Sequence, residues 1–223
     1  MCASYGLGGG PYLGDAGMFD LRPLDEKTSR AALLQWIEEF SGKSKITRHD
    51  PKTDTTNFNP IIRQVDEARQ LDFAWWFLWI GGQIPKFVTF NARDDKLTKV
   101  SSWVKPFQYR RALLPATWYV EKGKTFELNG GELFAMAAIY NVDVIDGAPM
   151  ISYSMVTRDA VGEALTANDR MPLILPKSMH DEWLNPDRVG DDELVEAAVS
   201  SADEISEMVA IQGSKGTMQA SLF

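Results

Sequence analysis

Cysteine, histidine and long apolar runs are scarce in this sequence. The chain of 223 residues has one cysteine and two histidines, His49 and His180, which lie far apart. One cysteine cannot form an internal disulfide, and these residues provide no Cys/His ligand set for a structural zinc. The longest apolar run, from Phe73 to Gly82, is too short to span a bilayer and follows no signal-peptide pattern. We therefore predict a cytoplasmic protein with no membrane segment, no metal and no cofactor.

The charges are unevenly distributed along the chain. The net charge of −8, taken over the whole sequence, disfavours a nucleic-acid partner. Basic residues nevertheless gather in one segment, at Lys86, Arg93, Lys96, Lys99, Lys105, Arg110, Arg111, Lys122 and Lys124. Acidic residues gather later, at Asp181, Glu182, Asp187, Asp191, Asp192, Glu193, Glu196, Asp203, Glu204 and Glu207. Phosphate groups respond to a local basic face rather than to net charge, so the basic segment is either a phosphate-binding face or an ordinary solvated surface.

Periodicity and turn signals predict an α+β fold. An amphipathic helix is expected over Asp25–Phe40, and Gly42 is its natural stop. Short β-rich runs predict strands at Phe73–Ile80, Lys86–Asn91, Arg111–Glu121, Thr125–Leu128, Leu133–Asn141 and Met150–Thr157. Further helices are predicted at Arg158–Ala167, Lys177–Leu184 and Asp191–Ser200. We expect a single domain over residues 1–223, with a curved or barrel-like, mainly antiparallel sheet, a few flanking helices and an acidic, mostly helical part from about residue 178.

The first two residues, Met1-Cys2, carry a distinctive chemistry. Removal of Met1 would leave an α-amine and a thiol on one residue, a 1,2-aminothiol that condenses with aldehydes. An α-amine ordinarily has a pKa of about 7.7–8.0, so its neutral fraction near neutral pH far exceeds that of a lysine. After imine formation the thiol can close a five-membered ring intramolecularly. The alternative is that Cys2 is an incidental residue of a frayed terminus.

Three further segments contain candidate functional residues, each with a structural alternative. In Phe90-Asn91-Ala92-Arg93, Asn91 follows a predicted strand and could simply cap a turn. In Arg110–Glu121, the Glu121 carboxylate ends an apolar strand; it lies either on the solvent face, the commoner case, or is buried with a raised pKa suited to proton transfer. Around Thr157 and Asn168–Pro176, charged residues adjoin an apolar strand, where an arginine more often anchors a loop than contacts a ligand.

Together these segments resemble the SOS response-associated peptidase (SRAP) family. That family begins Met-Cys, carries Asn-Ala-Arg at a strand end, and has a segment like Arg-Cys-Leu-Val-Pro-Ala-x-Gly-Phe-Tyr-Glu-Trp. It then has a Thr before His-Asp-Arg-Met-Pro-Val-Ile-Leu. Here Asn91-Ala92-Arg93, Arg111 to Glu121 and Thr157 to Leu175 match in order and spacing. The resemblance covers residues 58–186 well, and the N-terminal part only at Cys2.

The resemblance implies a monomeric protein that recognises abasic sites in single-stranded DNA. Cys2, freed by self-cleavage or by an aminopeptidase, would form a stable thiazolidine link to the ring-opened sugar aldehyde; the family also has DNA lyase activity. Catalytic roles are implied for Cys2, Asn91, Glu121 and Asn168, and DNA contacts for Arg93, Arg110, Arg111, Thr157 and Arg170. Aromatic residues such as Trp79, Phe87 or Trp118 either stack on bases or belong to the core.

The sequence also departs from the family pattern. Asn168 stands where the family has its active-site histidine, and an amide cannot exchange protons near neutral pH. The arginine that usually follows the cysteine is absent, and Ile61-Ile62 replaces Ala-Pro. We therefore expect attachment to abasic sites with weak strand cleavage and weak reversal of the link. The alternatives are a divergent, non-covalent DNA-binding module and a Cys-dependent self-processing peptidase or amide hydrolase.

Overall fold

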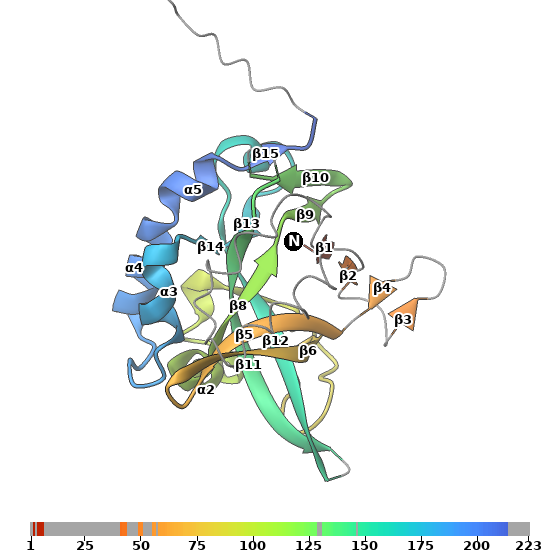
Figure 1. The fold of residues 1–223 in the computed structure, drawn as a ribbon, viewed down its shortest axis with the longest axis vertical. Coiled ribbons are helices and arrows are strands. Elements are labelled where there is room, and N and C mark those ends of the chain that lie inside the picture. Colours follow the sequence, from red (N-terminus) through yellow and green to blue (C-terminus); the bar gives the residue numbers. More distant parts are fainter. Residues whose placement is uncertain are drawn as a thin grey trace, which may run out of the picture.

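The computed structural model describes residue 2 and residues 4–6, 41–43, 49–50, 55–56, 58–128, 131–145 and 147–213. A closed ring of strands forms its centre (Figure 1). The ring consists of β5 (Phe58–Val65), β6 (Ala68–Trp76), β8 (Arg111–Ala116), β11 (Phe134–Ile145) and β12 (Ala148–Asp159). Neighbours pair in the order β12, β6, β5, β8, β11 and back to β12, and only the β12–β6 pair of this ring is parallel. The predicted barrel-like α+β fold is confirmed.

Short strands extend the ring at its edges. β7 (Asn91–Arg93) and β13 (Arg170–Pro172) both pair with β12, and β14 (Ile174–Leu175) pairs with β11. β7 runs parallel to β12, with Asn91 opposite Met155. Because β12 lies in the buried wall of the ring, this pairing holds the start of β7 at a fixed position against the core.

A second sheet leaves the ring at Thr117. β8 and β9 (Trp118–Glu121) are separated only by this residue, whose backbone N–H donates to the Gly6 carbonyl oxygen at 2.9 Å. The strand order is β15 (Ala210–Ile211), β10 (Lys124–Glu127), β9, β1 (Ser4–Gly6), β2 (Ser41–Lys43), β4 (Thr55–Thr56) and β3 (His49–Asp50). The predicted strand Arg111–Glu121 therefore passes from the ring into the second sheet and brings β1 with it.

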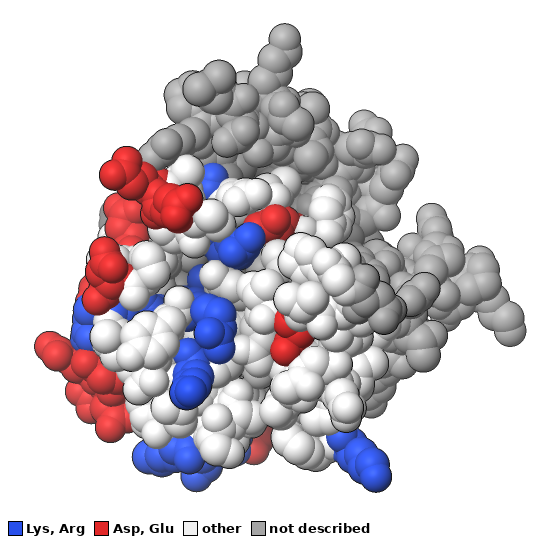
Figure 2. All heavy atoms as spheres, turned by 90° about the horizontal axis from the view of Figure 1, so that it is seen from below, with Lys and Arg blue, Asp and Glu red and all other residues white. Residues whose placement is uncertain are grey.

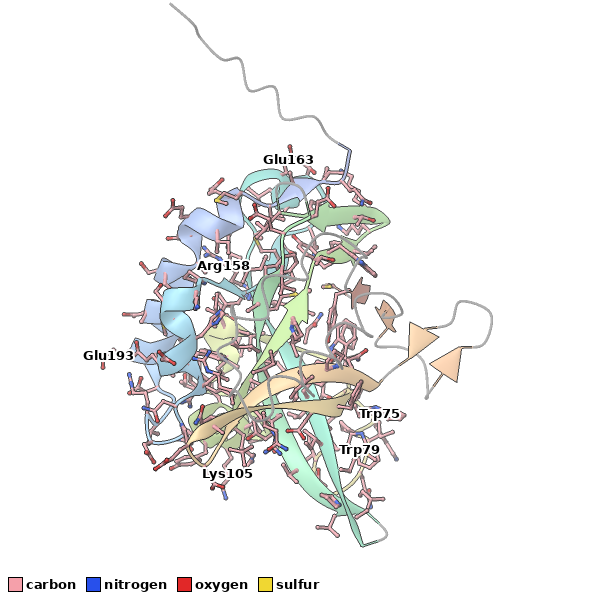
Figure 3. All side chains as sticks on the ribbon, viewed as in Figure 1. Trp75, Trp79, Lys105, Arg158, Glu163 and Glu193 are labelled. Carbon is pink, nitrogen blue, oxygen red and sulfur yellow. The ribbon has the colours of Figure 1, made fainter. Side chains whose placement is uncertain are left out.

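The C-terminal helices cover one side of the ring (Figure 1). They are α3 (Lys177–Leu184), α4 (Asp192–Ser201) and α5 (Asp203–Glu207). Arg158 of β12 (Figure 3) holds α4 and α5, because its guanidinium donates to the Val199 carbonyl oxygen at 3.0 Å and to the Asp203 carboxylate at 2.6 Å. Figure 2 shows acidic side chains gathered at this edge and Lys and Arg side chains toward the middle of the same face. Acidic and basic side chains are therefore separated on this face.

Burial along β11 shows where the core ends. Its first seven residues are buried, among them Ala135, Ala137 and Ala138. Beyond Tyr140 the strand alternates between half-buried and exposed residues, and Val144 is 72% exposed. Within the described part of the chain, this outer part of β11 pairs only with β12, and the two form a hairpin that projects from the ring (Figure 1).

Several predicted elements need correction. Arg158–Ala167 is not a helix: β12 continues to Asp159, and a 3₁₀ turn, η3, spans Gly162–Thr166. The strand predicted at Lys86–Asn91 is a loop up to the start of β7, and the strand predicted at Phe73–Ile80 is β6, which ends at Trp76. The sequence patterns did not predict α2 (Ser101–Tyr109) or the 3₁₀ turn η2 (Asp94–Lys96).

Other elements agree with the sequence or lie outside the described residues. α3 has the predicted bounds, and α4 and β10 lie within one residue of theirs. The helix predicted over Asp25–Phe40 lies outside the described residues. In the part of the chain that the structure describes, no helix is both long and apolar enough to cross a membrane.

Candidate functional site

Cys2 is buried beside the strand end that carries Glu121. Only 1% of the Cys2 surface is exposed. The residue precedes β1, whose antiparallel register pairs Ser4 with Val120 and so directs the N-terminal end of β1 toward Glu121. The side-chain amide of Asn91 donates a hydrogen bond to the Cys2 carbonyl oxygen at 2.8 Å. Cys2 is therefore tied to the ring through β7, which excludes the incidental, frayed terminus.

Glu121 is buried at the end of β9. Tyr119 and Glu121 are buried while the other two residues of β9 are half-buried, so both side chains project from the same face of the strand. A two-residue turn follows, in which Lys122 and Gly123 have positive φ values of 47° and 78°. Such a turn connects two antiparallel strands tightly and fixes the position of the carboxylate. Glu121 is therefore buried and does not lie on the solvent face.

Electrostatics place Cys2 and Glu121 close to Tyr119. Burial raises the pKa of Tyr119 well above its usual value, and the negative charges of Cys2 and Glu121 raise it further. The strand register agrees, because Tyr5 lies opposite Tyr119 and Ser4 opposite Val120, which puts the residues before Ser4 at the Glu121 end of β9. The three side chains therefore belong to one cluster.

A second layer of polar groups lies behind this cluster. The hydroxyls of Tyr5 and Tyr153 share a hydrogen bond of 2.6 Å, and Asn59 hydrogen-bonds Tyr153. Burial raises the pKa of both tyrosines, so both are neutral at physiological pH. Trp76 packs edge-on against Tyr5 at 4.8 Å between ring centroids and stacks on Tyr153 at 6.1 Å. This layer holds the N-terminal strand against the ring.

Asn168 lies in the segment next to the β9–β10 hairpin. It follows η3 and is half-buried, and its side-chain amide donates to the Arg170 carbonyl oxygen at 3.4 Å. Lys124, which pairs with Glu121 across the hairpin, reaches the Thr166 hydroxyl at 3.2 Å. Contacts therefore connect the segment that carries Asn168 to the strand end that carries Glu121.

The predicted DNA contacts on β7, β12 and β13 differ in exposure. The Arg93 side chain is 45% exposed and pairs with Asp95 at 2.9 Å. The Arg170 side chain is 5% exposed and binds the carboxylates of Asp94 and Asp159 and the Thr157 carbonyl oxygen. The Thr157 hydroxyl donates to a backbone carbonyl of β7 at 3.4 Å. Arg93 is thus available at the surface, whereas Arg170 and Thr157 hold β7, β12 and β13 together.

Arg110 and Arg111 make structural contacts. The Arg110 guanidinium donates to the Tyr140 carbonyl oxygen at 3.2 Å and to the Asn141 side chain at 2.9 Å. Arg111 is 3% exposed and donates to backbone carbonyl oxygens of Phe107, Gln108, Trp183, Asn185 and Arg188, at 2.5 to 2.8 Å. Burial, followed by the charge of Arg188, lowers the pKa of Arg111 to about 10, so the guanidinium is still charged at neutral pH. We therefore do not retain Arg111 among the expected DNA contacts.

Comparison with known proteins identifies the family. The family model described as SOS response associated peptidase (SRAP) matches residues 26–215. The chain belongs to the SRAP family. The matched residues begin after Cys2, so this membership rests on the body of the fold and does not depend on the N-terminal residue.

Relatives of this SRAP chain include proteins named for abasic sites. It is 25% identical over 170 residues to abasic site processing protein YoaM of Bacillus subtilis, covering 71% of this chain and 75% of that one. It is 29% identical over 150 residues to abasic site processing protein YoqW of Bacillus phage SPbeta, covering 62% and 67%. A crystal structure of a Bacteroides thetaiotaomicron protein superimposes with a TM-score of 0.65 at 21% identity, covering 89% of this chain and 86% of that one, which supports the fold.

Sequence reasoning missed part of the cluster in this SRAP chain. Cys2, Asn91 and Glu121 were all predicted from the sequence, and the structure brings them together. The sequence did not predict the three tyrosines of the cluster as site residues, because a buried tyrosine on a strand has the pattern of a core residue. They are Tyr5, Tyr119 and Tyr153. One signal was present: Tyr119 lies two residues before Glu121 and so on the same strand face.

Proposed function

We propose that the chain recognises abasic sites in single-stranded DNA and captures them through Cys2. Loss of Met1 would free the α-amine, which condenses with the ring-opened sugar aldehyde; the thiol then closes a thiazolidine ring. The single observation that carries this proposal is the burial of Cys2 beside Asn91 and Glu121. Membership in the SRAP family and the names of its relatives support the choice of substrate.

Asn91 and Glu121 would have complementary roles. Asn91 holds the Cys2 carbonyl with its amide nitrogen, while its Oδ1 atom is buried and makes no hydrogen bond within the described residues. That oxygen would accept a hydrogen bond from the α-amine and orient its lone pair. Glu121 would take a proton from the attacking amine and return it to the hydroxyl that leaves as water.

The path of the DNA would follow the surface near β7. Arg93 is the exposed cation on this strand and would contact a phosphate. Four residues before Asn91, Phe87 is 57% exposed and lines a groove of about 670 Å³ together with Lys86 and Ile84. An exposed aromatic ring beside a lysine suits an unpaired base and its phosphate. Arg110, Thr157 and Arg170 would act indirectly, by fixing the strands that carry Asn91 and Arg93.

Intact mass and a denaturing gel test the proposal. Purified protein should lose the mass of Met1 and then gain that of an oligonucleotide containing one abasic site, with no gain for the same oligonucleotide with an intact base. Salt-sensitive binding without a mass gain would favour the non-covalent module instead. Loss of Met1 without any adduct, together with cleavage of a peptide substrate, would favour the self-processing peptidase.

Replacement of Glu121 by glutamine should slow adduct formation. The change keeps the size of the side chain and removes its ability to exchange a proton, so we expect the rate to fall by about 10²- to 10⁴-fold. The measurement is the time course of the adduct on a denaturing gel. Glu132→Gln changes an exposed carboxylate of the same type and should leave the rate unchanged. Equal rates for Glu121→Gln and wild type would exclude the proton-transfer role.

Replacement of Asn168 by histidine should increase strand cleavage and reversal of the DNA link, the two activities that we expect to be weak. Asn168 is half-buried, so an imidazole can be accommodated, and its pKa lies near neutral pH. We expect strand cleavage beside the lesion, or release of a preformed adduct, to rise by at least about tenfold. Asn168→Gln is the matched control, because it alters the size of the side chain without adding a titrating group. Unchanged cleavage and release in the histidine variant would contradict the hypothesis.

A further inference from the structure

The hydroxyl of Tyr119 is buried without a hydrogen-bond partner among the described residues. Tyr119 is 1% exposed, and its ring stacks on Phe126 at 5.1 Å between centroids. In the register of β1 and β9 it lies directly opposite Tyr5, whose own hydroxyl is bonded to Tyr153. Leaving a polar group both buried and unpaired costs stability, so an unpaired hydroxyl in a functional cluster requires an explanation.

The surroundings of this hydroxyl indicate what it can bind. Tyr119 shares a strand face with Glu121 and lies within the electrostatic reach of both Glu121 and Cys2. Neither group is hydrogen-bonded to its Oη atom. Burial and the two negative charges raise the pKa of Tyr119, so the hydroxyl stays protonated and can donate a hydrogen bond at physiological pH. A donor is therefore available in the same cluster as the nucleophile and the carboxylate.

We propose, on the basis of the function above, that the Tyr119 hydroxyl donates a hydrogen bond to the aldehyde oxygen of the abasic site during capture. Attack of the Cys2 amine on the aldehyde carbon converts the C=O double bond to a C–O single bond, and the oxygen gains negative charge and then a proton. The C–O bond next breaks and a C=N bond forms, while the oxygen takes the second amine proton and leaves as water. The thiol sulfur finally adds to the same carbon, the C=N bond becomes a C–N single bond, and the thiol proton passes to the nitrogen. The sum is aldehyde plus aminothiol giving thiazolidine plus water.

Tyr119 would act where charge develops on the departing oxygen. A fixed donor in a buried site stabilises that charge more effectively than water does. Its proton is not transferred, because the exchange of protons belongs to Glu121. The family segment that the sequence resembles has phenylalanine at this position, which indicates that the site accepts a ring without the hydroxyl.

The variant Tyr119→Phe tests the inference. It removes one oxygen atom that has no protein partner among the described residues, so the melting temperature should not fall. We expect adduct formation with an abasic oligonucleotide to slow by about 10- to 100-fold. The ratio of wild-type to variant rate should stay constant across the neutral pH range, because Tyr119 does not titrate there. Tyr109→Phe, which removes a hydroxyl from a residue that is 50% exposed, is the matched control.

Alkylation of Cys2 by iodoacetamide separates this role from a structural one. The reaction uses the same sulfur but no aldehyde oxygen, so Tyr119→Phe should leave its rate unchanged. If alkylation slows as much as adduct formation, or if adduct formation is unchanged, the inference is wrong while the proposed function stands. If the wild-type protein forms no adduct, the proposed function fails and this inference fails with it.

Discussion

Replacement of Cys2 by alanine is expected to eliminate the adduct that survives a denaturing gel. The variant keeps the α-amine and can still form an imine, but it lacks the sulfur that closes the ring. An imine hydrolyses readily, whereas intramolecular ring closure is favoured by effective concentrations of about 10⁵ M or more. We therefore expect the yield of stable adduct to fall at least a hundredfold, to about the background of the assay.

A reductant distinguishes the two steps of this chemistry. Cyanoborohydride delivers hydride to the C=N bond and converts a transient imine to a stable secondary amine. With reductant present, Cys2→Ala should therefore regain an adduct, which peptide mapping should locate at the N-terminal amine. Binding of the abasic oligonucleotide under native conditions should persist and so control for folding. A stable adduct of Cys2→Ala without reductant, or one that maps to a lysine, would contradict capture by the aminothiol.

The sequence predicted the strands of the ring better than the segments between them. Leu133–Asn141 and Met150–Thr157 were placed correctly but too short, because β11 and β12 continue into a projecting hairpin in which valines of β11 are exposed. The helix predicted at Arg158–Ala167 failed because the polar residues that follow Thr157 resemble a helix start. In the fold, β13 pairs with the end of β12 and keeps it extended. Tertiary pairing overrode local propensity there.

The failure to predict helix α2 from the sequence has a different cause. Pro106 lies inside it, and a proline within a helix removes one hydrogen bond and normally marks a boundary. Packing compensates for that loss, because Pro106 and Phe107 are both buried and Phe107 lies 5.9 Å from Trp183 between ring centroids. Neither contact can be deduced from the local sequence.

Residues of the candidate site were predictable where both their chemistry and their order along the chain matched the family pattern. Cys2, Asn91 and Glu121 could be assigned from the pattern, but whether Glu121 is buried depends on the pairing of β9 with β1 and β10. The arginines show most clearly that exposure depends on the fold and not on the local sequence. Arg93 and Arg111 carry the same charge in the same basic segment, and only the fold places one at the surface and the other among backbone carbonyls.

Arg111 is expected to contribute more to stability than any other predicted DNA contact. Its guanidinium donates to the last turns of both α2 and α3, where the negative ends of the helix dipoles favour a cation. The Arg111→Met variant would fill similar space but leave buried carbonyl oxygens without donors. We expect a loss of about 3–5 kcal/mol in the free energy of unfolding, measured by urea denaturation. Arg111→Lys, which restores charge but fewer donors, should recover only part of the loss.

Arg93→Gln is the matched control: it should weaken DNA binding and leave stability nearly unchanged. Its side chain is 45% exposed and, among the described residues, forms an ion pair only with the neighbouring exposed Asp95, so stability should change by less than about 0.5 kcal/mol. Affinity for single-stranded DNA should fall, and the slope of its salt dependence should decrease by about 1, as expected for one lost phosphate contact. If Arg111→Met instead remained stable and lost only DNA affinity with the same change in slope, its guanidinium would be a DNA contact. The carbonyl contacts at the ends of α2 and α3 would then have little energetic importance.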